Sequence, residues 1–412
     1  MTERVLIMGA AGRDFHDFNT AYRGRDDARV VAFTAAPGQN LGETQKGGHD
    51  RYPSELAGEG YPEGVPIHPE AELEDLIREE SVDTVVFSYS DVRHENVMHA
   101  GSRAIAAGAD FEIRGPETAM LDAPVPVIAV DAVRTGCGKS QVTRALADEL
   151  QSRGVEPAVI REPMPYGDLV EGRVRRFETM ADLDDADVTI EEREEYEQQI
   201  ERDHVVYAGV DYGDVIAEAS AEADVLLWDG GNNELPFVDP DLHLVLCDPL
   251  RPGDETGYHP GEANLRMADY ALLNKENSAE QADIDSVVEN VEQVNPEAEI
   301  LHADSVVSVE SPDAVEGAGV LVVEDGPTLT HGDASSGAGT VAAEKYGASE
   351  RIDPEPYAVG TVADTLEAYP HLDSVLPAMG YSDNQIADLE ATIEHADPAL
   401  VLAGTPHDLS RV

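Results

Sequence analysis

The stretch Arg134-Thr-Gly-Cys-Gly-Lys-Ser140 follows the apolar run Pro126-Val-Ile-Ala-Val130 and precedes a helical pattern that opens at Gln141. A buried strand, a glycine-containing loop and Gly-Lys-Ser at a helix start form the pattern of a phosphate-binding loop. Glycines let backbone N–H groups close around phosphate oxygens, the lysine reaches the outer phosphates, and the serine hydroxyl can bind Mg²⁺. The residues predicted to bind a nucleotide here are Thr135, Gly136, Cys137, Gly138, Lys139, Ser140 and Gln141.

The loop departs from the common pattern at its first position, where Val133 stands in place of glycine. In this it resembles the variant loop of the MinD and nitrogenase-iron-protein branch of P-loop proteins, in which a basic residue stands at the position of Arg134. We therefore expect Arg134 and Lys139 to be catalytic, with Arg134 stabilising the transferring γ-phosphoryl group.

A second motif, Val225-Leu-Leu-Trp-Asp-Gly-Gly231, predicts an apolar strand that crosses the core and ends at Asp229. A carboxylate at the end of such a strand can bind Mg²⁺ or its water opposite Ser140. The sequence therefore predicts Asp229 and Ser140 as metal ligands and gives Asp229 a catalytic role. An aspartate that only caps the strand end is the alternative.

A third motif concerns the nucleotide base. The stretch Leu272-Leu-Asn-Lys-Glu-Asn277 resembles the Asn-Lys-x-Asp motif of GTPases. The motif predicts base-side contacts from Asn274, Lys275 and Asn277. The amide of Asn277 offers one acceptor oxygen and an NH₂ group where an aspartate would accept two guanine protons. This difference favours ATP and leaves GTP as the alternative. Mg²⁺ is the expected metal, and K⁺ is a further candidate ion.

The net charge is −57, from 84 acidic and 27 basic residues, and 42% of the chain is apolar. The charge argues against nucleic acid and anionic membranes as partners, and the apolar share argues against a disordered chain. Apolar stretches fall well short of the ~20 residues of a membrane helix. We expect a cytoplasmic protein of a halophilic archaeon, because molar salt screens such charge. The sequence leaves a homo-oligomer open.

Strand and helix patterns alternate along the chain, which predicts an α/β protein with parallel sheets. Residues 1–124 read as a Rossmann-like α/β domain that opens with the glycine loop Gly9-Ala-Ala-Gly12. Residues 125–298 read as the P-loop domain, and residues 299–412 as a C-terminal α/β region. A final strand near Leu400 is followed by Gly404-Thr-Pro-His, where a new helix is expected, so the C-terminal region is predicted to be truncated.

Arginines gather at predicted strand ends in a chain that otherwise avoids positive charge. Arginine binds phosphate and carboxylate through two parallel hydrogen bonds, so these positions predict a specific anionic substrate. For Arg173 and Arg176, salt bridges to nearby glutamates are the alternative, and for the histidine an exposed loop position is as plausible. The predicted substrate-binding residues are Arg161, Arg173, Arg176, Arg251 and His331.

Several of these stretches resemble the archaeal cyclic 2,3-diphosphoglycerate synthetases and relatives described as predicted GTPases. The stretches are MGAAGRDFHDFN, SYSDVRHENVMHA, VRTGCGKS, REPMPYGDL, ERDHVVYAGVDY, LWDGGNN, DPLRPG and VEDGPTLTHG. The resemblance implies a ligase that uses ATP to close an intramolecular phosphoanhydride in 2,3-diphosphoglycerate, releasing ADP and phosphate. A nucleotide switch or regulator, and the same ligase chemistry on another small phosphorylated or carboxylated acid, are the competing hypotheses.

Overall fold

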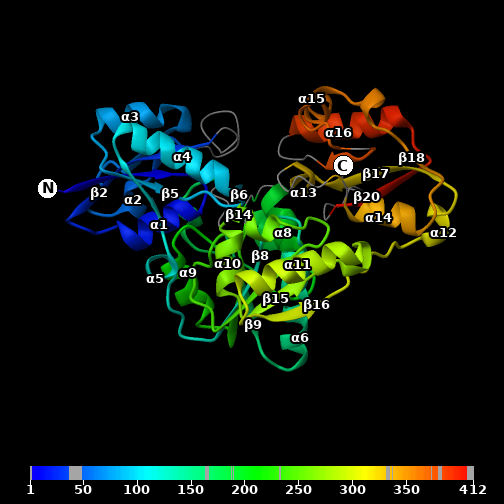
Figure 1. The fold of residues 1–412 in the computed structure, drawn as a ribbon, viewed down its shortest axis with the longest axis horizontal. Coiled ribbons are helices and arrows are strands. Elements are labelled where there is room, and N and C mark those ends of the chain that lie inside the picture. The colour runs from blue at the N-terminus through cyan, green and yellow to red at the C-terminus, as the bar shows by residue number, and fades with distance from the viewer. Residues whose placement is uncertain are drawn as a thin grey trace. The chain divides into compact units, whose positions relative to one another are not determined.

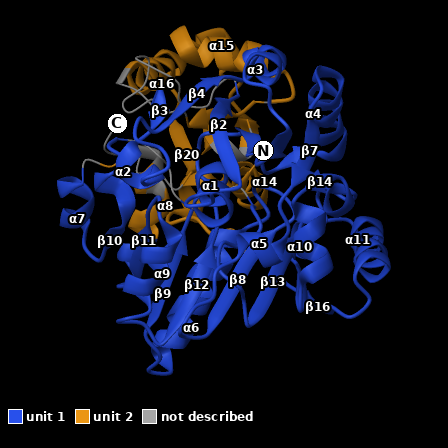
Figure 2. Ribbon diagram, turned by 90° about the vertical axis from the view of Figure 1, so that its left-hand side faces the viewer, with its two compact units in different colours: residues 1–186, 199–303 blue, residues 187–198, 304–412 orange. Residues whose placement is uncertain are grey.

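The computed structural model describes residues 2–36, 49–162, 167–186, 188, 190–231, 233–330, 335, 337–372, 374–378 and 383–405. Two compact units are present, one of residues 1–186 and 199–303 and one of residues 187–198 and 304–412 (Figure 2). The two N-terminal regions predicted from the sequence therefore share the first unit. Each of them has a sheet of its own. Helix α8 (Ile190–Ile200) runs across the division between the units.

The first sheet has six described strands in the order β3-β4-β2-β1-β5-β7. They are β1 (Glu3–Met8), β2 (Ala28–Ala35), β3 (Arg51–Tyr52), β4 (Val65–Pro69), β5 (Thr84–Phe87) and β7 (Asp110–Ile113). All pairs except β3–β4 are parallel. The helices are α1 (Arg13–Ala21), α2 (Ser54–Ala57), α3 (Leu73–Glu79), α4 (His94–Ala107) and α5 (Pro116–Ala119). The chain winds outward in opposite directions from β1 and β5, and ligands of such sheets bind beyond the carboxyl ends at that point.

The second sheet has eight described strands in the order β10-β11-β9-β12-β8-β13-β15-β16, with only β10 antiparallel. Strands β8, β9, β15 and β16 are labelled in Figure 1, and β10 to β13 in Figure 2. They are β8 (Val127–Ala132), β9 (Pro157–Arg161), β10 (Arg175–Phe177), β11 (Val205–Ala208), β12 (Val225–Asp229), β13 (Leu242–Cys247), β15 (Tyr270–Leu273) and β16 (Glu299–His302). The helices are α6 (Lys139–Ser152), α7 (Met180–Asp185), α9 (Tyr212–Ala219), α10 (Gly261–Met267) and α11 (Gln281–Val294). The middle strand β8 leads into the phosphate-loop motif.

The two sheets of the first unit are joined by a small ribbon and by aromatic packing. Strand β6 (Val92–Arg93) pairs antiparallel with β14 (Tyr258–His259). His16 of α1 stacks on Phe237, which follows β12, with ring centroids 4.0 Å apart. These contacts fix the first sheet against the loops of the second.

The second unit contains a parallel sheet centred on β17 (Gly319–Asp325). Its other strands are β18 (Glu350–Arg351), β19 (Leu376–Ala378) and β20 (Leu400–Gly404). Its helices are α12 (Pro312–Val315), α13 (Gly326–Thr330), α14 (Ala338–Lys345), α15 (Gly360–Ala368) and α16 (Asp383–Ala396). The predicted α/β class is confirmed in both units. The helix expected after Gly404 falls outside the described residues, and no described helix is long and apolar enough to cross a membrane.

Candidate functional site

The loop between β8 and α6 has the backbone conformation of a tight glycine turn. Gly136 and Gly138 have positive φ angles of 85° and 102°. A Cβ atom on Gly138 would overlap with the side-chain amide nitrogen of Asn274. Both the left-handed conformation and this close approach therefore require glycine at position 138.

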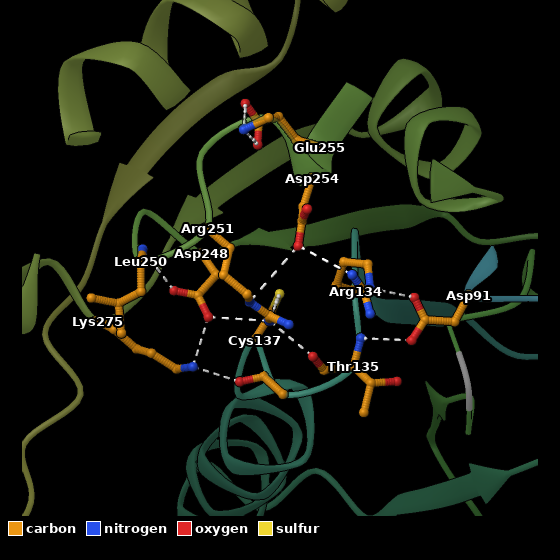
Figure 3. A network of polar contacts seen from close by, with 12 residues as sticks. Asp91, Arg134, Thr135, Cys137, Asp248, Leu250, Arg251, Asp254, Glu255 and Lys275 are labelled. Carbon is orange, nitrogen blue, oxygen red and sulfur yellow. Dashed lines mark hydrogen bonds and ion pairs between the residues drawn. The ribbon is translucent and has the colours of Figure 1, made fainter. Parts of the chain in front are cut away.

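Side chains from two other strand ends hold the loop's carbonyl groups (Figure 3). Arg251 donates to the Thr135 oxygen at 2.8 Å, Lys275 to the Gly136 oxygen at 2.6 Å, and Asn274 to the Cys137 oxygen at 2.8 Å. In a planar trans peptide the C=O and the following N–H point in opposite directions. Anchoring three carbonyls therefore turns the next three N–H groups to the other side, as an anion-binding loop requires.

Lys139 and Arg161 both contact the carboxylate of Asp229, at the carboxyl end of β12. Lys139 Nζ lies 2.7 Å from Oδ1 and Arg161 Nη1 lies 2.6 Å from Oδ2. Lys139 also donates to the Gly230 carbonyl. Burial by itself raises the pKa of Asp229, but the charges of Arg161 and Lys139 outweigh it and lower the pKa to about 2. Paired with Arg161 and Lys139, Asp229 is thus held in its ionised form at neutral pH.

The two predicted metal ligands lie near one another. Arg161 Nη1 is 2.6 Å from Asp229 Oδ2 and 3.5 Å from the Ser140 hydroxyl oxygen. A hydroxyl and an ionised carboxylate are the oxygen donors that Mg²⁺ prefers, so the pair fits a Mg²⁺ site.

Arg134 lies in a buried ion pair. Only 2% of the residue is exposed. Its Nε lies 2.8 Å from Asp91 and its Nη1 3.3 Å from Asp254, while its guanidinium stacks 3.7 Å from the centre of the Tyr258 ring. In this conformation Arg134 links the phosphate loop to the first sheet. Its predicted action on the γ-phosphoryl group stays a prediction.

The residues predicted to contact the nucleotide base lie in two different settings. Asn274 and Lys275 support the loop carbonyls, and Lys275 also pairs with Asp248 at 2.7 Å. Asn277 is exposed in the short 3₁₀ helix Glu276–Ser278. Base contacts by these three residues remain predictions, as do nucleotide contacts by Gln141, which is exposed on α6.

The predicted substrate arginines lie in three separate places, and the described ones are paired with carboxylates. Arg161 is at the centre of the site, and Arg251 lies beside the loop, 3.2 Å from Asp248. Arg173 precedes the edge strand β10 and pairs with Asp214, while Arg176 pairs with Glu222 at 2.7 Å. His331 lies outside the described residues.

Sequence reasoning missed the acidic partners of these cations. Asp91 follows β5 and accepts the Thr135 N–H at 3.2 Å in addition to pairing with Arg134. Asp248 follows β13 and joins Arg251 to Lys275. Asp248 comes directly after β13 and Asp91 four residues after β5, both beyond the carboxyl ends of buried parallel strands, which is the signal that could have marked them.

Comparison with known proteins gives one relative over the full length. Arginine synthetase ArcE of Thermococcus kodakarensis is 55% identical over 409 residues, which cover 99% of this chain and 90% of that protein. No protein-family model matches the chain.

Solved structures give weaker likenesses. The LpxK of Aquifex aeolicus in complex with ATP is 14% identical, with a TM-score of 0.34 over 56% of this chain and 71% of that one. The cobyrinic acid a,c-diamide synthase of Mycobacterium smegmatis with ADP and magnesium is 15% identical, with a TM-score of 0.20 over 66% and 93%. The family is therefore shown by the 55% sequence identity over the full length. The chain belongs to the family of the Thermococcus arginine synthetase.

Proposed function

We propose that this protein is an ATP-dependent ligase that forms arginine. The observation that carries the proposal is the 55% identity to an arginine synthetase across 99% of the chain. The geometry around Lys139, Ser140 and Asp229 supports it, because it is suited to bind and transfer a phosphoryl group.

The chemistry of arginine limits what an ATP-driven synthetase can do. Its guanidinium carbon carries three nitrogens, so a precursor that carries oxygen at one of these positions is a ureido amino acid. The ureido oxygen attacks the γ-phosphorus and ADP leaves. Ammonia then attacks the activated carbon, its nitrogen passes one proton to the departing phosphate, and that phosphate leaves with the original oxygen. The sum is ureido acid, ammonia and ATP to arginine, ADP and phosphate, with no change of oxidation state.

The chain's own residues would bind and orient the phosphates. The loop N–H groups and Lys139 would hold the β- and γ-phosphates, and Lys139 would offset charge on the transferring group. Ser140 and Asp229 would hold Mg²⁺, which when bound neutralises charge on the phosphate oxygens. Arg161 would keep Asp229 ionised and oriented.

The charge of the site bears on the competing hypothesis of cyclic 2,3-diphosphoglycerate synthesis. That substrate carries two phosphates and a carboxylate and would need several cations free to bind it. Here Arg161, Arg173, Arg176 and Arg251 all have carboxylate partners. Carboxylates at the site favour a substrate whose charge is balanced, such as an amino acid.

The test is phosphate release by purified protein in concentrated KCl with Mg-ATP. We expect release and arginine formation only when L-citrulline, a ureido amino acid, and ammonium are both present. Replacing them with 2,3-diphosphoglycerate should give none, and GTP should be a poorer donor than ATP. Phosphate release with 2,3-diphosphoglycerate but not with L-citrulline would refute the proposal in favour of the cyclising ligase.

A further inference from the structure

A recess of about 260 Å³ lies in the first unit, outside the phosphate loop. This volume includes space that is open to solvent, and the enclosed part has room for about one water molecule, so a ligand group would lie mostly in the open part of the recess. Its polar lining comes from both sheets: Arg13, Ser88, Ser90, Arg114, Glu234 and His259.

The recess lies where a ligand of the first sheet is expected. Ser88 and Ser90 follow β5, and Arg114 follows β7, so both belong to the carboxyl edge of the parallel sheet. Arg13 opens α1, directly after the glycine loop that ends β1. Because β1 and β5 are the neighbours from which the sheet winds in opposite directions, this is the predicted position of a binding crevice.

On each side of the recess, a residue one or two positions from a lining residue contacts the phosphate loop. Next to Ser90, Asp91 accepts the Thr135 N–H at 3.2 Å. Next to Glu234, Asn233 donates to the Thr135 hydroxyl at 3.3 Å. Two residues after His259, Gly261 packs so closely on the Val133 carbonyl that a Cβ atom would overlap with it. The recess therefore adjoins the start of the phosphate loop, at Val133 and Thr135.

One wall presents a cation with hydrogen-bonding capacity to spare. Arg114 pairs with Glu112 at 2.7 Å, and its side chain is 13% exposed. Its Nε is buried and has no hydrogen-bond partner among the described residues. A buried N–H of a guanidinium without an acceptor is costly, so an anionic ligand group beside it would be stabilised. Arg13, by contrast, is already held by Asp17 at 3.0 Å and by the Leu235 carbonyl.

The other wall presents a carboxylate. Glu234 is 1% exposed and accepts from the Ser90 hydroxyl at 3.0 Å. Asn264 anchors its backbone by donating to the Glu234 carbonyl at 3.0 Å. His259 adds no charge at neutral pH, because burial, followed by the charges of Arg13 and His94, lowers its pKa to about 4.

We propose that this recess binds the amino-acid end of the substrate, with Arg114 holding the α-carboxylate and Glu234 holding the α-ammonium group. The inference rests on the proposed function, which supplies an α-amino acid as the substrate class. A cation and an anion on different walls of one small recess match the charges of that group. The side chain of the ligand would then extend toward the phosphate loop, where its ureido oxygen reacts.

The test is calorimetric titration of the full chain with three probes. L-arginine carries both α-groups, agmatine lacks the carboxylate, and 5-guanidinopentanoate lacks the ammonium. Arg114→Met should weaken L-arginine binding by about 10- to 100-fold, the loss expected for a hydrogen bond to a charged group, and should leave agmatine binding unchanged. Glu234→Gln should weaken L-arginine and agmatine but not 5-guanidinopentanoate.

Matched controls are the exposed Arg78→Met and Glu59→Gln, which should bind all three probes as the wild type does. Thermal unfolding checks that each variant is folded. If Arg114→Met does not fold, Arg114→Lys takes its place in the titrations. Wild-type binding of L-arginine with equal losses for all three probes, or with none, would overturn the recess assignment and leave the proposed function intact. A wild type that binds neither L-arginine nor L-citrulline, with or without Mg-ATP, would overturn both.

Discussion

The buried pair of Asp91 and Arg134 should couple the first sheet to the phosphate loop, and a double-mutant cycle can measure that coupling. Arg134 is 2% exposed, its Nε lies 2.8 Å from Asp91, and a guanidinium does not lose its proton in a protein. Asp91→Asn removes the nearest negative charge and leaves Asp254, 3.3 Å away, and the Tyr258 ring to compensate.

The magnitude follows from this geometry. Removing one partner of a buried ion pair costs about 3–5 kcal/mol of unfolding free energy when nothing compensates. Because Asp254 and Tyr258 remain, we expect about 2–3 kcal/mol for Asp91→Asn. At a few degrees per kcal/mol for a large domain, the unfolding temperature should fall by roughly 5–10 °C. Replacing both partners removes the buried charge, so Asp91→Asn with Arg134→Met should be more stable than the sum of the single changes.

The assay is differential scanning calorimetry at fixed KCl and protein concentration. Asp75 and Arg78, an exposed pair 3.0 Å apart, provide the control cycle, which should show additive and small effects. If Asp91→Asn unfolds within about 1 °C of the wild type, or if its effect adds to that of Arg134→Met, the pair does not couple the two parts and our reasoning fails.

Three further predictions concern the loop, pH and salt. Gly138→Ala should lower ADP affinity at least ~10-fold in a fluorescence titration because its Cβ meets Asn274, whereas Gly154→Ala, at a positive φ with open space around it, should not. His16 has a pKa lowered to about 3, chiefly by burial, from the 6.5 of the unfolded chain. The unfolded state therefore takes up this proton first, stability falls as pH drops below 6.5, and His16→Gln should flatten the unfolding temperature between pH 7 and 5. The net charge of −57 predicts an unfolding temperature that rises from about 0.1 M to about 1 M KCl as repulsion is screened, and a flat response would contradict this.

The sequence predicts the features that depend on short, continuous stretches of residues. The run before Arg134 and the run before Asp229 are each apolar enough to be central strands, and both lie in the middle of the sheet as β8 and β12. The short edge strand β10 carries no such local signal, because Arg-Arg-Phe has no apolar alternation and forms a strand by pairing with β11.

The roles of cations could not be predicted in the same way, because they depend on partners distant in sequence. Lys275 and Asn274 resemble a base-binding motif, yet they reach 139 and 137 residues back along the chain to hold loop carbonyls. Arg176 lies in a basic cluster that predicts substrate binding. In the structure it donates to Glu222, 46 residues away, and its contact with substrate stays a prediction. In a chain with 84 acidic residues, an arginine cluster is as readily explained by internal carboxylates as by an anionic ligand.

The pairing of Lys139 with Asp229 has a consequence for how the site would take up its nucleotide. A lysine that turns to a phosphate must leave Asp229 Oδ1, 2.7 Å away. Asp229 would then be a buried carboxylate that keeps Arg161 as its cationic partner among the described residues. A divalent cation replaces the lost charge on that side, so the exchange stays nearly neutral only when nucleotide and metal arrive together. We therefore predict that the high cost of an unpaired buried charge would make nucleotide binding and metal binding cooperative at this site.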